Sequence, residues 1–264
     1  MANTKVTVKK GKKVALKPVV KPFTSKQKVT YTSSNKKVAT VSSKGVVTGK
    51  KKGTAKITVK SGSKSVKVTV KVKNPYFEDM DSYYGLINEG KTAVIEMASC
   101  AGLPLVEDRK DPRKTTTYGV GQLILAAAES GVEKIIVGLG GSSTNDGGCG
   151  AAAAVGVKFY DRDGKEFVPT GGTTADICKI DLSGKAEILN KVEIVTMCDI
   201  DNPMYGPTGA SHIFGPQKGA DEAMVLELDE GIKNLSRAIT EAIGKDISEV
   251  PGTGAAGAMG AGMI

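Results

Sequence analysis

The sequence predicts a small all-β segment, residues 1–73, followed by an α/β segment, residues 74–264. Their charges differ sharply: residues 1–73 carry 21 Lys and no Arg, Asp or Glu, whereas residues 74–264 carry 16 basic and 28 acidic residues. The first segment alternates apolar and polar residues with a period of two, and the second alternates apolar runs with helical patterns. A multidomain chain is therefore expected, although its net charge of +9 suggests one mildly basic protein.

Composition excludes several classes of protein. A hydrophobic content of 40% is typical of globular proteins, and no apolar run reaches the roughly 20 residues of a membrane span. The N-terminus shows no secretory signal. The four cysteines, all in the second segment, form no CxxC pair, which argues against a zinc site or a disulfide framework. We expect a cytoplasmic α/β domain with reduced thiols.

The all-β segment is predicted from three alternating runs, Lys5–Val8, Lys56–Lys60 and Val66–Val72, in which one face is apolar and the other carries Lys or Thr. Turn signals recur about every 8–12 residues, as in a β-sandwich. The lysines allow two interpretations. They form a face for nonspecific binding of polyanions, or they are the solvated outer face of the strands. No aromatic residues interleave with them, so specific nucleic-acid binding is not expected.

A family resemblance supports the sandwich. The run YTSSNKKVATVSSKGVVTGKKKGTAKITV resembles the group 2 bacterial immunoglobulin-like domain, with Tyr31 in place of a frequent tryptophan. The resemblance implies an immunoglobulin-like β-sandwich over residues 1–73 that acts as a spacer or adhesive module and carries no chemistry.

The α/β segment is predicted from alternating strand and helix patterns. Its long final helix has an apolar stripe that includes Leu228, Ile232 and Leu235. The expected strands are 92–97, 134–139, 157–160 and 192–198, and the expected helices are 118–130, 147–155 and 221–243.

A loop of small residues follows the strand at 134–139 and precedes a helix. Such loops let backbone N–H groups approach an anion, and the hydroxyl and acidic side chains here suit phosphate or Mg²⁺. The alternative is a tight turn in which Asp146 caps the helix. The candidate ligand-binding residues are Gly140, Gly141, Ser142, Ser143, Thr144, Asn145 and Asp146.

A second cluster, Asp199, Asp201 and Asn202, follows the strand at 192–198. Ligands bind at the carboxyl ends of strands in open α/β sheets, so these residues are candidates for accepting a substrate proton or holding Mg²⁺. The alternative is turn chemistry before Pro203.

Three further side chains are candidates. Lys218, between glycines and before a helix, suits a phosphate or carboxylate, or is a solvated loop lysine. His212 is a catalyst or a hydrogen-bonded structural residue. Glu96 interrupts an apolar run, where a buried carboxylate needs a partner, so it is a functional acid or part of a network.

Five ordered motifs resemble the class I bacterial glycerate kinase family: TAVIEMASCAGL, TTTYGVGQLI, GLGGSSTNDGGCGAAAAVG, CDIDNPMYGPTGASHIFGPQKGA and PGTGAAGAMGAGM. The resemblance implies ATP-dependent, Mg²⁺-assisted phosphorylation of D-glycerate to 2-phosphoglycerate. It makes 140–146 and 199–202 the expected lining of a cleft, without fixing which residues hold the metal.

The family's N- and C-terminal segments have no counterpart in these 264 residues, so the chain resembles the middle of the family and little kinase activity is expected of it alone. The alternative function is non-catalytic: a natural or engineered fusion of an immunoglobulin-like module with a truncated kinase domain, serving as a structural or interaction unit.

Overall fold

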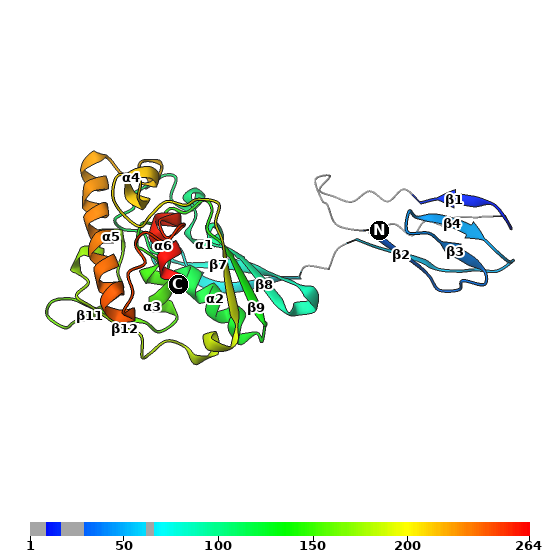
Figure 1. Ribbon diagram of the computed structural model, residues 1–264, viewed down its shortest axis with the longest axis horizontal. Coiled ribbons are helices and arrows are strands. Elements are labelled where there is room, and N and C mark those ends of the chain that lie inside the picture. The colour runs from blue at the N-terminus through cyan, green and yellow to red at the C-terminus, as the bar shows by residue number, and fades with distance from the viewer. Residues whose placement is uncertain (1–8, 17–28, 62–65) are drawn as a thin grey trace. The chain divides into compact units, whose positions relative to one another are not determined.

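The computed structural model describes residues 9–16, 29–61 and 66–264, which fall into two compact units, Met1–Lys64 and Ser65–Ile264 (Figure 1). The described strands of the first unit form two antiparallel sheets. The run predicted at Lys56–Lys60 is a strand one residue further along, Ile57–Ser61, whereas Lys5–Val8 lies outside the described residues. One sheet has the order β1(Lys13–Ala15)-β4(Val46–Gly49)-β3(Ala39–Val41), and the other pairs β2(Val29–Ser33) with β5(Ile57–Ser61).

The predicted immunoglobulin-like sandwich over residues 1–73 is wrong. A sandwich buries the inner faces of two packed sheets, yet among the described residues of the first unit Val47 is the one buried hydrophobic residue. The strand expected to complete the sandwich, β6 (Val66–Lys73), pairs along its whole length with β7 (Asp79–Ile87) of the second unit. Its apolar face enters the core there, with Val72 only 1% exposed.

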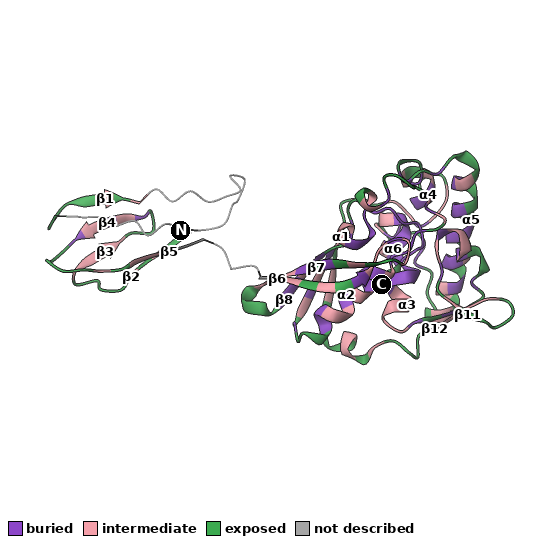
Figure 2. Cartoon of the chain, turned by 180° about the vertical axis from the view of Figure 1, so that it is seen from behind, coloured by how far each residue is buried: buried purple, intermediate pink, exposed green. Residues whose placement is uncertain are grey.

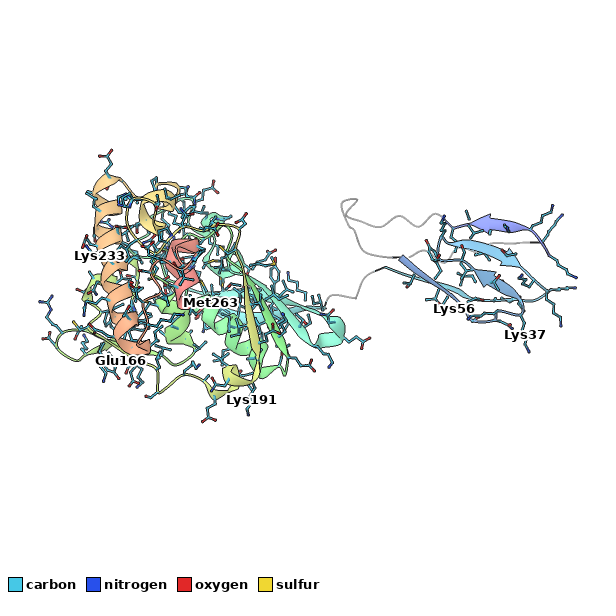
Figure 3. The ribbon with its side chains drawn as sticks, in the orientation of Figure 1. Lys37, Lys56, Glu166, Lys191, Lys233 and Met263 are labelled. Carbon is cyan, nitrogen blue, oxygen red and sulfur yellow. The ribbon has the colours of Figure 1, made fainter. Side chains whose placement is uncertain are left out.

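The lysines of the first unit whose side chains are described are exposed. All eleven that lie within its described residues and have a defined side-chain burial are open to solvent, and Figure 3 shows two of them, Lys37 and Lys56, extending away from the strands. Binding of polyanions to this surface stays a prediction.

The second unit is built on a five-stranded mixed sheet of order β13-β9-β8-β7-β6. Strands β8 (Thr92–Glu96), β9 (Lys134–Gly138) and β13 (Glu193–Met197) are parallel, and β7 and β6 run antiparallel to their neighbours. This α/β unit confirms the strands expected at 92–97, 134–139 and 192–198, each within a residue or two of its predicted ends.

One helix, α2 (Tyr118–Glu129), packs on the central sheet, and the main core lies between them. It buries Val120, Leu123 and Ile124 against the strands (Figure 2). Helix α3 (Cys149–Ala154) is shorter than the predicted 147–155, because Gly147 and Gly148 adopt left-handed backbone with φ of 61° and 78°. The helices α1 (Ala98–Ala101) and α6 (Ala255–Gly262) also contribute buried residues to this core, Cys100 and Ala101 from α1 and Ala255 and Met259 from α6.

A second core forms around α5 (Glu222–Ile243), whose apolar stripe buries Leu228, Ile232 and Leu235 as predicted. The Asp221 carboxylate caps this helix by accepting the Met224 N–H at 2.8 Å. The small antiparallel sheet β11(Glu166–Phe167)-β10(Lys158–Tyr160)-β12(Lys179–Asp181) lies in this region, with α4 (Ala210–Phe214) and α6 (Ala255–Gly262). The 3-10 turns are η1 (Asn88–Gly90), η2 (Leu103–Leu105), η3 (Gly171–Asp176), η4 (Glu187–Lys191) and η5 (Pro216–Lys218). Among the described residues, none of the helices could span a lipid bilayer.

Candidate functional site

Three parallel strands end at the same edge of the central sheet. The last residue of β8, Glu96, pairs with Gly138 of β9, and Gly138 pairs with Met197 at the end of β13. Since neighbouring strands lie about 4.8 Å apart, Glu96 and Met197 stand roughly 10 Å from each other across Gly138. This carboxyl edge is where open α/β sheets bind ligands.

Four of the predicted residues that reach this edge are exposed, and a fifth is half-buried. Gly140 and Gly141 leave β9, and the Leu139 N–H donates to the Met197 carbonyl at 3.2 Å, which holds the two loops side by side. Asp199 and Asp201 follow β13 and are exposed, while the half-buried Asn202 donates from its amide to the Thr208 carbonyl at 2.8 Å. The structure therefore brings the glycine pair and the acidic cluster to one edge.

Glu96 also lies at this edge, but it is exposed. The expectation that it is a buried carboxylate was wrong, because it is the last residue of β8, where the apolar run meets solvent.

The rest of the predicted loop, residues 142–146, is buried. The Ser143 hydroxyl donates to the Ala101 carbonyl at 3.0 Å, and the Asn145 amide donates to the Ser211 hydroxyl at 3.0 Å. Helix α6 closes on the loop so tightly that a Cβ at Gly257 would lie 2.1 Å from the Thr144 carbonyl oxygen. These side chains hold the loop in place below the exposed Gly140 and Gly141.

Asp146 is the centre of a buried hydrogen-bond network. Its carboxylate accepts the Thr117 N–H at 2.7 Å and hydroxyl at 2.8 Å, and the N–H groups of Gly148 and Gly150 at 3.2 and 3.1 Å. Burial raises the pKa of this carboxyl, and the bonds from Thr117, Gly150 and Gly148 oppose that shift. One carboxylate thus satisfies backbone donors at the starts of both α2 and α3.

Thr117 was not among the predicted site residues. A threonine directly before the helix at 118 is a recognisable N-cap signal, yet its partner lies 29 residues further along the chain, which local patterns do not reveal.

Lys218 is buried, with 1% of its surface exposed. Its ammonium donates to the Thr144 carbonyl at 2.6 Å. Burial lowers its pKa to about 7, and the nearby charge of Asp146 acts in the opposite direction. It is therefore neither a solvated loop lysine nor a group exposed at the carboxyl edge. In the same region, the Thr144 hydroxyl and the Asn145 side-chain oxygen are buried without a hydrogen-bond partner.

His212 lies on α4 and faces a different carboxylate. Its Nε2 is 3.7 Å from Asp229 on α5, and Asp229 also accepts the Gly206 N–H at 3.0 Å. Burial raises the pKa of Asp229, against the effect of these contacts. The sequence analysis did not single out Asp229. Its spacing could have shown it, because it follows the buried Val225 by four residues and precedes Ile232 by three, which places it near the buried stripe of α5.

Within the described part of the chain, no group of three or more His, Cys, Asp or Glu side chains could hold a metal ion.

Comparison with known proteins gives one family. A model of the glycerate kinase family matches residues 26–264. The chain is 44% identical over 196 residues to the glycerate kinase of Halalkalibacterium halodurans, covering 74% of this chain and 52% of the relative. It is 46% identical over 194 residues to the glycerate 2-kinase of Escherichia coli K12, covering 73% of this chain and 51% of that protein.

A solved structure from the same family also matches this chain. A crystal structure assigned to glycerate kinase 2 of Salmonella typhimurium LT2 matches with a TM-score of 0.73 and 40% identity, over 75% of this chain and 53% of that one. The chain thus spans about half the length of the relatives it matches. The family match begins at residue 26, inside the segment interpreted from sequence as immunoglobulin-like, and no comparison shows an immunoglobulin-like domain.

Replacing Asp146 tests its structural role. Asp146→Ala leaves the buried N–H groups of Thr117, Gly148 and Gly150 without their acceptor, at about 1–3 kcal/mol each. We expect the free energy of unfolding, measured in urea, to fall by about 3 kcal/mol or more. Asp181→Ala is the control, because Asp181 accepts the Ser183 N–H at 2.9 Å in exposed surroundings where water can replace it. Equal losses in the two variants would contradict the assignment.

Burial of Lys218 should make the free energy of unfolding depend on pH. Its pKa is about 7 in the folded chain, against an ordinary 10.5, so between these values the unfolded state binds more protons and the free energy of unfolding rises with pH. Lys218→Met removes this group. We expect the stability of the wild type relative to that variant to increase from pH 7 to pH 9 in urea denaturation series. A difference that stays constant across those pH values counts against a buried, proton-releasing Lys218.

Proposed function

Because the chain belongs to the glycerate kinase family, we propose that its carboxyl edge forms part of a site that transfers a phosphoryl group from ATP to D-glycerate, giving 2-phosphoglycerate. The observation that carries the proposal is the meeting of Gly140 and Gly141 with Asp199 and Asp201 at one exposed edge of parallel strands. Phosphoryl transfer depends on positioning and on neutralising charge, and this edge offers a backbone surface beside two carboxylates.

The glycine pair is suited to the phosphates. Both residues are exposed, and no residue other than its two chain neighbours has a heavy atom within 4 Å of the position that a Cβ would take on Gly140. A phosphate can therefore approach the backbone there without meeting a side chain, and N–H groups in such loops bind anions. The buried residues 142–146 and Lys218 support this surface from below and do not contact the nucleotide.

The acidic pair is suited to a magnesium ion that arrives with ATP. Magnesium is commonly held by one or two carboxylates together with phosphate oxygens and water, and the exposed Asp199 and Asp201 provide such donors. The ion would neutralise negative charge on the transferred phosphoryl group. Without it, the two carboxylates would repel the phosphates, so the acidic pair favours nucleotide only as its magnesium complex.

We also assign acceptance of the proton from the glycerate hydroxyl to a carboxylate at this edge. Its exposed carboxylates are Glu96, Asp199 and Asp201, and a carboxylate in hydrogen-bond reach of the hydroxyl serves as the base in phosphoryl transfer. Asn202, whose amide is held by Thr208, positions the segment that carries the two aspartates.

Calorimetry with the 264-residue chain tests this proposal. We expect ATP to bind in the presence of Mg²⁺, and the double variant Asp199→Asn, Asp201→Asn to bind at least about tenfold more weakly, as the loss of charged contacts implies. With EDTA present, the double variant should bind ATP no more weakly than the wild type, since two repulsive charges are gone.

Asp163→Asn is the matched control, because Asp163 is exposed in the turn between β10 and β11, away from the edge. Equal affinity of the double variant and the wild type for ATP–Mg²⁺ would refute the assignment of the acidic pair. No heat with ATP or D-glycerate in any form of the chain would favour the non-catalytic alternative.

A further inference from the structure

The start of the fifth sequence motif, Pro251–Gly257, contacts both the acidic and the glycine-rich side of the carboxyl edge. The run follows α5 and leads into α6 (Figure 1). Its one polar side chain is that of Thr253, which is 1% exposed and donates to the Val250 carbonyl at 2.8 Å. Any part that this run plays in ligand binding must therefore act through the neighbouring backbone that it holds.

Gly254 lies directly against the segment that carries the acidic pair. Its N–H donates to the Asn202 carbonyl at 2.9 Å, and an added Cβ would lie 2.1 Å from the Pro203 carbonyl oxygen. Only glycine allows two backbones to approach so closely. Within the described part of the chain, the side chains of Asp199 and Asp201 have no hydrogen bond or ion pair. The position of these carboxylates therefore depends on the backbone that Gly254 contacts.

Gly257 makes a similar contact with the loop that follows β9. Its carbonyl accepts the Gly147 N–H at 3.0 Å, and an added Cβ would lie 2.1 Å from the Thr144 carbonyl oxygen. Thr144 belongs to the buried stretch directly behind the exposed Gly140 and Gly141. One run thus contacts the acidic segment at Gly254 and the glycine-rich loop three residues later.

The backbone at the second contact is strained. Ala256, Gly257 and Ala258 have left-handed φ angles of 57°, 72° and 64°, a conformation that alanine rarely adopts. Such conformations persist only where the surrounding contacts hold them, and they gather at functional sites. Because three residues span at most about 11 Å, the run keeps its contacts with the acidic segment and the loop at a short, set distance.

We propose that Gly254 and Gly257 are positioning residues, which hold the acidic pair and the glycine pair at the separation that lets one ATP–Mg²⁺ complex contact both. The identity of the ligand rests on the proposed function, whereas the positioning is a property of the chain without ligand. Such positioning matters because a misplacement of about 1 Å can slow a reaction about 100-fold.

Gly254→Ala tests the proposal. The φ of Gly254 is −74°, which alanine adopts readily, so the substitution adds a clash with the acidic segment and no backbone strain. Gly156→Ala is the matched control, because its added Cβ would lie equally close, 2.1 Å, to the Gly184 carbonyl oxygen. Gly156 follows α3 and contacts neither side of the carboxyl edge. Circular dichroism and urea unfolding show whether each variant is folded.

Amide chemical shifts of the isotope-labelled chain without ligand give the first result. We expect Gly254→Ala to shift the amides of residues 199–202 and, through Gly257, those of residues 144–147, and Gly156→Ala to leave both sets in place. In calorimetry, ATP–Mg²⁺ should bind Gly254→Ala about tenfold more weakly than wild type, and Gly156→Ala within twofold of wild type. With EDTA present, Gly254→Ala and wild type should bind ATP equally, because the displaced acidic pair acts through the metal.

A folded Gly254→Ala in which residues 199–202 keep their shifts would overturn the proposal. Movement of 199–202 without 144–147 would refute the coupling of the two sides. An equal loss of ATP–Mg²⁺ affinity in Gly156→Ala would also overturn it, because the loss would then follow from reduced stability. Failure of the wild type to bind ATP–Mg²⁺ would instead contradict the proposed function, and the shifts without ligand would still decide the positioning.

Discussion

The carboxylate of Asp146 is the contact on which the second unit depends most. It accepts backbone N–H groups from the start of α2 and from the turn that leads into α3, and it is fully buried while doing so. A buried charge is costly unless several donors satisfy it, and here one group pairs donors from both helix starts. These bonds tie the loop between β9 and α3 to the starts of both helices. The loop leaves Gly140 and Gly141 at the surface and residues 142–146 inside.

This constraint separates two roles that the sequence places in one motif. The exposed glycine pair lies beside Asp199 and Asp201, where a charged ligand can reach backbone and carboxylates together. The buried part of the motif holds that surface rigid through Ser143, Asn145 and the contact of Lys218 with the Thr144 carbonyl. Such support under an exposed backbone suits the phosphoryl transfer that we propose, since catalysis of that reaction consists mainly of positioning and charge neutralisation.

The strands and helices of the α/β unit could be predicted because their apolar periods are long and bounded by glycine or capping residues, as for α5 after Asp221. The position of the acidic cluster could be predicted because it directly follows the apolar run that forms β13. The partner of β6 could not, because a period of two shows that one face is buried but not which sheet buries it. The burial of Lys218 and the pairing of Asp146 with Thr117 also depend on contacts between distant segments. The local sequence pattern gives no information about which distant segments come into contact.

We propose that ATP and Mg²⁺ bind at the carboxyl edge of β8, β9 and β13. Amide chemical shifts of the isotope-labelled chain, followed during titration with ATP and Mg²⁺, test it most directly. The shifts should be largest at Gly138, Gly140, Gly141 and residues 199–202, with Asp163 unchanged. Shifts centred instead on His212 and the start of α5, with the edge unaffected, would contradict it.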